Sequence, residues 1–139
     1  LSSLVDRHNL SLRECYQLSP TVRPTEHTMR SRDGIYVFRW FDVMNRDVDE
    51  IVKLSDEAWA PFEGGFDSQV QGLFAERDRS HEQGKMLLLT WYRDLRVWEE
   101  SRRPAKEARE RFLRRHDLTI ETIAIATRLF LSRKLGKAQ

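Results

Sequence analysis

Aromatic and β-branched residues dominate residues 34–43, which read GIYVFRWFDV. Such residues favour strands, and successive side chains of a strand point to opposite faces. Both sides of this segment are bulky, so we predict a central strand. The two sets are Tyr36, Phe38 and Trp40 on one side, and Ile35, Val37, Arg39 and Phe41 on the other. The wholly apolar first set predicts the face that helices cover, and the second set places the charge of Arg39 on the opposite face.

The hydrophobic period then changes to that of a helix. Asp47, with Glu50 three residues later, resembles a capping box in which Asp replaces Ser or Thr. Pro61 lacks an N–H, and the Gly-Gly pair after it supplies flexible backbone, so the helix is expected to end there. Apolar residues recur on one face of this helix, namely Val48, Ile51, Val52, Ala58, Trp59 and Phe62.

Two strands, two helical segments and a final strand are predicted in the rest of the chain. Residues 70–74 and 85–92 form a hairpin with a polar turn. Asp94 is placed to cap a short helix, and Pro104 suits the first position of another. The Thr- and Ile-rich residues 118–131 predict a fourth strand. The order βαββαβ is the ferredoxin-like arrangement of the α+β class, with one antiparallel sheet.

The first part of the chain differs from the rest in composition. Residues 19–34 contain Pro20, Pro24 and many Ser, Thr and Arg residues, which predicts an irregular arm. The alternation in residues 9–18 favours an extended segment that packs on something. We therefore divide the chain into an N-terminal arm, residues 1–33, and a ferredoxin-like domain, residues 34–139.

The predicted sheet has a second face that helices leave open. We expect that face to carry apolar side chains, among them Val37, Phe41, Leu88 and Ala124. Soluble monomers rarely expose so large an apolar patch. A symmetric homodimer, in which two sheets close into a barrel, would bury it.

Four stretches of the sequence resemble one known protein family. They are YVFRWF (36–41), SDEAWAPFE (55–63), VQGLF (70–74) and LLLTWYRDLRVWEESR (87–102), the last leading to RFLRRHDLT. Through them, roughly the last three-quarters of the chain resembles the NIPSNAP family of the dimeric α+β barrel superfamily. The resemblance implies a homodimeric barrel. It does not fix a function, because the wider superfamily includes cofactor-independent monooxygenases, haem-degrading enzymes, lactone isomerases and stress proteins.

Charge narrows the range of partners. The net charge is +2, but basic residues outnumber acids from Arg93 to Lys137. This asymmetry indicates either an anionic partner or a solvated helix face on which Arg and Glu pair at helical spacing. The ribonucleoprotein motifs of ferredoxin-like RNA binders are missing, so we expect no nucleic-acid partner.

Membrane and redox signals point to the cytoplasm. No apolar run approaches the roughly 20 residues that span a bilayer, and no signal-peptide pattern begins the sequence, so no membrane partner is expected. The sequence has one cysteine, Cys15, which allows no disulfide within the chain and fits a reducing compartment. We expect Cys15 to be a buried structural thiol.

Five residues are candidates to line a cavity inside the barrel: Arg39, Phe41, Tyr92, Arg128 and Glu63. An apolar cavity with a few convergent polar groups is the usual form of a small-molecule site. Arg39 would anchor a carboxylate or enolate, and Tyr92 would form a hydrogen bond or donate a proton.

A structural role is the alternative for two of these candidates. Arg39 would then pair with an acid on a neighbouring strand, such as Glu76 or Glu121. Glu63 follows the predicted helix and would reach either the mouth of the barrel or an arm residue such as Arg23 or Arg30.

No metal site and no cofactor are expected. The four histidines, His8, His27, His81 and His116, are scattered along the sequence. None lies on a predicted cavity-lining strand position, although haem ligation stays open.

Three functions remain for this sequence. The first is binding of a small, partly apolar molecule in the barrel. The second is a cofactor-independent enzyme, either a monooxygenase or an isomerase-like proton-transfer catalyst, acting on an activated aromatic or polyketide-like substrate. The third is a protein-interaction module that uses the N-terminal arm.

Overall fold

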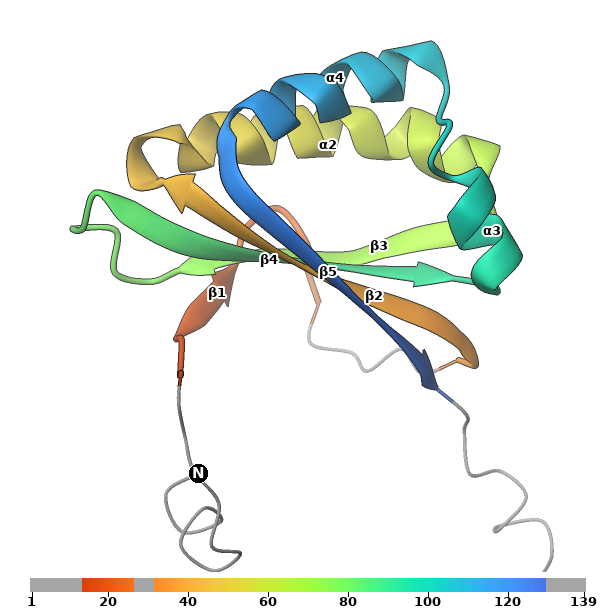
Figure 1. The fold of residues 1–139 in the computed structure, drawn as a ribbon, viewed down its shortest axis with the longest axis horizontal. Coiled ribbons are helices and arrows are strands. Elements are labelled where there is room, and N and C mark those ends of the chain that lie inside the picture. The colour runs from red at the N-terminus through yellow and green to blue at the C-terminus, as the bar shows by residue number, and fades with distance from the viewer. Residues whose placement is uncertain (1–13, 27–31, 130–139) are drawn as a thin grey trace, which may run out of the picture.

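A computed structural model describes residues 14–26 and 32–129 of the chain. In chain order the elements are β1 (Leu18–Pro20), β2 (Gly34–Met44), the 3-10 turn η1 (Asn45–Asp47), α2 (Val48–Gly65), β3 (Ser68–Glu76), β4 (Gln83–Tyr92), α3 (Leu95–Glu100), α4 (Lys106–Asp117) and β5 (Thr119–Leu129). Within the described residues the strands form one antiparallel sheet in the order β1-β3-β4-β2-β5. Helices α2 and α4 lie side by side and antiparallel on one face of this sheet, and α3 lies near one end of it (Figure 1).

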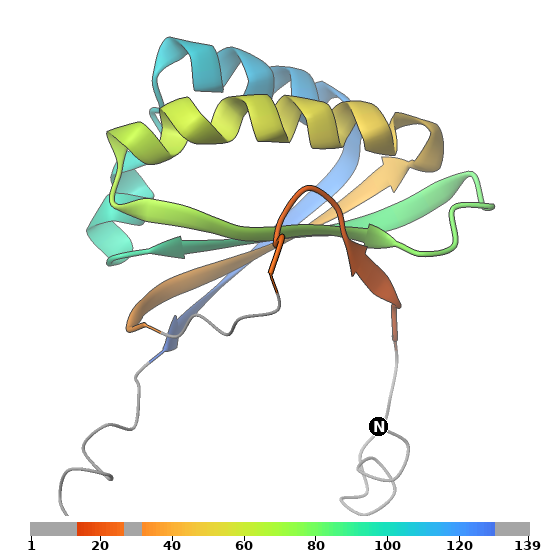
Figure 2. The same ribbon diagram turned by 180° about the vertical axis from the view of Figure 1, so that it is seen from behind.

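The predicted βαββαβ order is confirmed, and the fold is ferredoxin-like α+β. The arm adds a strand to it, because β1 pairs with β3 at the edge of the sheet, Leu18 opposite Glu76. After β1 the chain arches over the outer edge of β3 toward α2 (Figure 2). There Thr21 N donates to Leu73 O at 2.9 Å, and Leu73 N donates to Arg23 O at 3.1 Å. The described part of the arm is therefore bound to its own sheet.

Helix α2 buries the predicted apolar stripe. Ile51, Trp59 and Phe62 on this stripe are at most 5% exposed. Pro61 does not end the helix but lies inside it, and the helix continues to the predicted Gly-Gly pair. Asp47 occupies the N-cap position, but its side chain makes no cap hydrogen bond, so the predicted capping box does not form.

Helix α3 begins with a side-chain cap. Asp94 Oδ1 accepts a hydrogen bond from Val97 N at 2.9 Å and so caps α3, as predicted. Pro104 precedes α4 rather than opening it, since the helix begins at Lys106. Phe112 of α4 then packs against Phe62 of α2, with ring centroids 5.5 Å apart.

The faces of β2 are the reverse of the sequence prediction. Val37 and Phe41 are 0% and 3% exposed and pack in the core beneath the helices, and the Tyr36, Phe38 and Trp40 set lies on the open face. The aromatic and β-branched residues by themselves did not decide between the two faces, because they occur in both sets. The next member of the aromatic set is Asp42, which forms an ion pair with Lys85. A carboxylate under the helices would lose its hydration, so the aromatic set faces outward.

The open face is still apolar, but with other residues than predicted. Leu88 lies opposite Leu73 in the core, whereas Phe38 of the open face lies between Leu89 of β4 and Ile125 of β5. Segments of the arm cover part of this face. Tyr16 packs on Trp40 with ring centroids 5.8 Å apart.

Gly72 lies at a close contact between β3 and the arm. A Cβ atom there would lie 2.7 Å from the ring of Phe74 and 3.0 Å from Pro24 Cδ. Any side chain at this position would force Pro24 of the arm away from β3.

Candidate functional site

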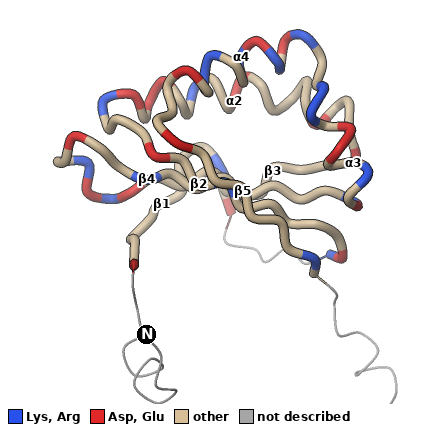
Figure 3. Tube along the Cα trace, viewed as in Figure 1, with Lys and Arg blue, Asp and Glu red and all other residues tan. Residues whose placement is uncertain are grey.

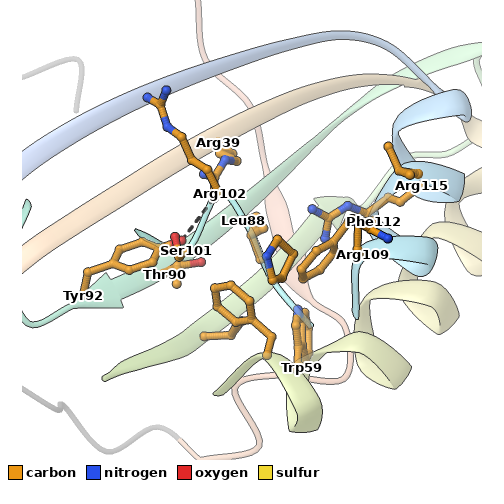
Figure 4. Close-up of a pocket in the computed structure, with 14 residues that line it drawn as sticks. Arg39, Trp59, Leu88, Thr90, Tyr92, Ser101, Arg102, Arg109, Phe112 and Arg115 are labelled. Carbon is orange, nitrogen blue, oxygen red and sulfur yellow. Dashed lines mark hydrogen bonds between the residues drawn. The ribbon is translucent and has the colours of Figure 1, made fainter. Parts of the chain in front are cut away.

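A pocket lies on the helix-covered face of the sheet, beneath α2, α4 and the connection between α3 and α4. Its volume is about 270 Å³. Fourteen of the described residues line it, and Figure 4 shows most of them with labels. Its apolar wall consists of Trp59, Phe62, Val70, Leu88, Phe112 and Leu113. The pocket therefore belongs to a single chain, and it lies on the opposite side of the sheet from the expected barrel interior.

Arg39 and Tyr92 meet in this pocket. Arg39 Nη1 donates to Tyr92 Oη at 3.5 Å, drawn as the dashed line in Figure 4. They come from neighbouring antiparallel strands, where Arg39 lies opposite Leu88 and Tyr92 opposite Ile35. Tyr92 is only 1% exposed, so its ring is fixed by the core. Its hydroxyl accepts from Arg39 and keeps its own proton for another acceptor.

Arg39 has no carboxylate partner among the residues that the structure describes. The two acids considered as partners have other neighbours. Glu76 Oε1 accepts from Lys85 N at 2.7 Å, and Glu121 lies opposite Asp42 in the β2–β5 ladder. In the described chain Arg39 therefore pairs with neither of the acids that the structural alternative named.

Arg115 of α4 brings a second guanidinium to the pocket. Its Nη1 donates to Ser55 Oγ at 3.1 Å, and its guanidinium lies 4.7 Å from the ring centroid of Phe112 and 5.3 Å from that of Phe41. The residue as a whole is half-buried, but desolvation of the guanidinium and then repulsion from Arg39 lower the pKa of Arg115 to about 10. Arg115 remains charged at neutral pH.

Two further arginines, Arg102 and Arg109, stand at the exposed rim of the pocket. Arg102 Nε lies 3.5 Å from Glu99 Oε2, which offsets part of its charge. For Arg109, no ion pair occurs within the described part of the chain. The pocket thus has an apolar floor and a cationic rim, a combination that attracts anions from solution.

The indole N–H of Trp59 is a buried hydrogen-bond donor in the lining of the pocket. Trp59 is 1% exposed, and its Nε1 atom has no hydrogen-bond partner within residues 14–26 and 32–129. Figure 4 shows Trp59 rising from α2 toward the other lining residues. On the arm side, the guanidinium of Arg23 lies 4.8 Å from the centroid of the ring. Buried donors in native structures are nearly always paired, so this N–H is, within the described chain, an unsatisfied donor on a residue that lines the pocket.

The other sequence candidates lie elsewhere. Phe41 is a core residue beside Arg115 rather than a lining residue. Glu63 binds Arg23 of the arm, one of the two alternatives considered for it; Arg30 lies outside the described residues. Arg128 is exposed on β5, opposite Ile35.

Sequence reasoning missed Arg115, Arg102 and Arg109 as pocket residues. A signal for Arg115 was present, because Ala108, Phe112 and Arg115 fall on one face of a helix at spacings of four and three. An arginine on the apolar stripe of a helix ends up beneath that helix.

Charges on the outer surface of the helices form pairs instead of a single-sign patch. Blue and red segments both occur along α3 and α4, and α2 is mainly red with a single lysine (Figure 3). Arg96 Nε lies 3.1 Å from Glu100 Oε1 within α3, and Arg111 Nε lies 3.1 Å from Glu57 Oε2 across α2 and α4. These pairs fit the solvated-face alternative for the basic half of the chain.

The described residues do not suit a metal or haem. Among them no group of three or more His, Cys, Asp or Glu side chains could hold a metal ion. His81 Nε2 lies 3.6 Å from Asp78 Oδ2 in the β3–β4 turn, and His116 is exposed at the end of α4. Neither lines the pocket, and His8 and His27 lie outside the described residues. Haem iron would find there only the phenol of Tyr92, which already accepts a hydrogen bond from Arg39.

Two further findings concern the exposure of Cys15 and whether any helix could cross a membrane. Cys15 is exposed, so the prediction of a buried structural thiol was wrong. Its neighbour Tyr16 takes the packing position instead. In the described part of the chain, no helix combines the length and the apolar character that crossing a membrane requires.

The antiparallel sheet with helices on one face and a pocket beneath them defines a ferredoxin-like α+β protein. Two crystal structures share this fold. One is of a NIPSNAP family protein from Agrobacterium tumefaciens strain C58, with a TM-score of 0.54 and 16% identity over 81% of this chain and 95% of that one. The other is of a proposed antibiotic biosynthesis monooxygenase from Caulobacter crescentus CB15, with a TM-score of 0.54 and 11% identity over 71% of this chain and 92% of that one.

These likenesses confirm the predicted resemblance at the level of the fold. No model of a known protein family matches the sequence, and no curated protein matches it either. The function must therefore be argued from the site.

Proposed function

We propose that this protein binds a small, partly apolar molecule in the pocket between its sheet and its helices. The observation that carries the proposal is the pocket itself: a volume of about 270 Å³ with an apolar wall and the polar groups of Arg39, Tyr92 and Arg115. An apolar cavity of roughly 150 Å³ holds benzene. The larger pocket suits a substituted ring or a short fused ring system.

The pocket suits a ligand that has both apolar and polar parts. The pocket combines an apolar wall with the hydrogen-bonded Arg39–Tyr92 pair. A ligand with one apolar and one polar end satisfies both regions at once. The supporting core is closely packed, which keeps the site largely formed before binding.

We further propose that the protein is a cytoplasmic homodimer. Ile123 and Ile125 of β5 are 51% and 50% exposed and share the open face of the sheet with Phe38. Burying such side chains contributes about 25 cal/mol for each Å² of apolar surface. A second copy that packs its sheet on this face would cover them.

Catalysis without a cofactor is a second candidate function, favoured by the Arg39–Tyr92 pair. The hydroxyl of Tyr92 retains a proton, and the charge of Arg39 would stabilise an enolate. The reaction would be either proton transfer within the ligand or oxygenation in which the enolate supplies electrons to O₂. The fold is shared with a proposed antibiotic biosynthesis monooxygenase, which is compatible with this candidate.

The interaction-module alternative receives less support. In the described residues of the arm, β1 pairs with β3, and Arg23 is bound to Glu63. These groups are occupied by the chain itself. A protein partner that is lost when residues 1–33 are deleted would revive this alternative.

A thermal-shift screen with a small-molecule library tests the binding function. Ligands of the native state raise its apparent stability, so binders increase Tm. We expect reproducible increases that Arg39→Ala abolishes. Arg114→Ala is the matched control, because Arg114 is exposed on α4 and does not line the pocket. Product formed from a stabilising ligand would identify an enzyme. If both variants keep the shifts, the ligand binds elsewhere and the proposed site is wrong.

A further inference from the structure

Four arginines and a tryptophan that only donate hydrogen bonds line the pocket, whereas the side-chain acceptors in its lining are the hydroxyls of Thr90, Tyr92 and Ser101. Arg39, Arg115 and the indole of Trp59 line it, and none of these side chains can accept a hydrogen bond. Tyr92 accepts from Arg39 and has a proton to donate. A ligand that satisfies these groups must supply acceptor atoms.

The two guanidiniums still have most of their donors available. Each contains five N–H groups. Among the described residues, Arg39 uses one of them toward Tyr92 Oη at 3.5 Å, and Arg115 uses one toward Ser55 Oγ at 3.1 Å. No carboxylate of the described chain pairs with either guanidinium. In a pocket with an apolar wall, two unpaired cations are costly unless an anion joins them.

The arginines also act on each other. Repulsion from Arg39 follows desolvation among the causes that lower the pKa of Arg115. The pair therefore disfavours the folded state while the pocket is empty, which is typical of residues retained for a function. An anion between them removes this repulsion and gains two charge-assisted interactions.

The shape and lining of the pocket favour an organic anion over an inorganic one. Phe62, Leu88 and Phe112 in its wall require an apolar body, and its volume is about 270 Å³. The planar guanidinium fork matches a carboxylate by two parallel hydrogen bonds. Trp59 adds a buried donor without a partner in the described chain, suited to a further ligand oxygen.

On the basis of the proposed binding function, we propose that the ligand is a small planar organic carboxylate whose carboxylate lies between Arg39 and Arg115. Its ring system packs against the apolar wall of the pocket. Trp59 donates its indole N–H to an oxygen of the ligand. Arg102 and Arg109 at the rim accelerate the arrival of the anion.

The experiment compares two probes of nearly equal shape, 2-naphthoate and the neutral 2-naphthamide. Each is titrated into the full chain by calorimetry and by ¹⁵N NMR of the tryptophan indoles, with the Trp59 resonance assigned from Trp59→Phe. We expect naphthoate to bind at least tenfold more tightly than naphthamide and to shift the Trp59 resonance. Added salt should weaken the binding of naphthoate more than that of naphthamide.

Charge-removing variants identify the groups responsible. Arg39→Met and Arg115→Met should each lose at least tenfold in affinity for naphthoate and change little for naphthamide. Arg114→Met, on the same helix as Arg115 and outside the pocket, should match the wild type. A Tm measured for each variant separates lost binding from lost folding.

The outcomes distinguish the two proposals. Equal affinity for acid and amide, with Trp59 shifted by both, would overturn the carboxylate inference and leave the binding function standing. Tight naphthoate binding that neither arginine variant weakens would also overturn it. Failure of both probes and of the library screen to bind the folded protein would overturn both proposals.

Discussion

Arg23 of the arm holds Glu63 of α2 through two hydrogen bonds, at 2.9 and 3.0 Å. Glu63 also accepts from Val70 N at 2.7 Å, which ties α2 to the start of β3. The same guanidinium lies over the ring of Trp59, a residue that lines the pocket. The ion pair therefore connects the arm, the helix and the pocket wall at one point.

Glu63→Gln should reduce the free energy of unfolding by roughly 1 to 2 kcal/mol. The amide keeps an acceptor for Val70 N but leaves Arg23 without its counter-charge in a partly buried place. Urea denaturation measures the loss. Glu57→Gln is the matched control, because Glu57 pairs with Arg111 at 3.1 Å on the exposed helix surface. Exposed pairs contribute at most about 1 kcal/mol, so the control should lose less. Equal losses would show that the arm contact contributes little.

Arg115→Met should stabilise the empty protein by roughly 1 to 2 kcal/mol near neutral pH. Each unit by which the pKa is lowered corresponds to about 1.4 kcal/mol of destabilisation. The variant also loses the contacts of the guanidinium with the aromatic rings, and this loss offsets part of the gain. The pKa of Arg115 is lowered to about 10 in the folded chain, so the unfolded chain binds more protons above that pH. Stability of the wild type relative to the variant therefore rises as pH increases through 10. Thermal unfolding of both proteins from pH 8 to 11 measures this difference, and Arg114→Met should show none. A constant difference across this range would contradict the desolvated state of Arg115.

Asp94→Ala should lower Tm by a few degrees, because it removes the cap of α3. Asp94→Asn keeps an acceptor for Val97 N and should cost less. The hydrogen bond from Val97 N, followed by that from Arg93, lowers the pKa of Asp94 below its ordinary value of 3.8. The charge-dependent stabilisation is thus present above pH 3.8 and is lost as pH falls through the lower folded value. The Tm of wild type and of Asp94→Asn should be measured as pH is lowered, and the higher Tm of the wild type should disappear in that pH window. A difference in Tm that does not change with pH would contradict the stabilising role of the Asp94 charge.

Ile123→Glu should convert the proposed homodimer into monomers with folded secondary structure. Ile123 lies opposite Trp40 on the open face, so a buried glutamate there would lose its hydration against a second sheet. Light scattering at micromolar concentration measures the mass. Thr122→Glu, one position along on the other side of β5, is the control and should remain dimeric. A monomeric wild type would contradict the dimer directly.

The sequence by itself determined the order of the elements. The dense aromatic run in β2, the helical stripe of Ile51, Trp59 and Phe62, and the Thr- and Ile-rich β5 are local patterns with a period that backbone geometry imposes. Asp94 was also predictable, because a cap needs only its own helix. Arg39 and Tyr92 were also predicted as polar cavity residues, because each lies in a predicted strand of mostly apolar residues.

The tertiary structure settled which face of the sheet lies under the helices. Both faces of β2 are rich in apolar residues; Asp42 was a local sign that the aromatic set faces outward, and packing across the whole layer completed the choice. That choice moved Arg39 and Tyr92 from the barrel side to the helix side. It also brought Arg115 from α4, 76 positions after Arg39 in the sequence, into the same pocket. Repulsion between two arginines depends on the distance between them in space, and the periodicity of the sequence does not specify that distance.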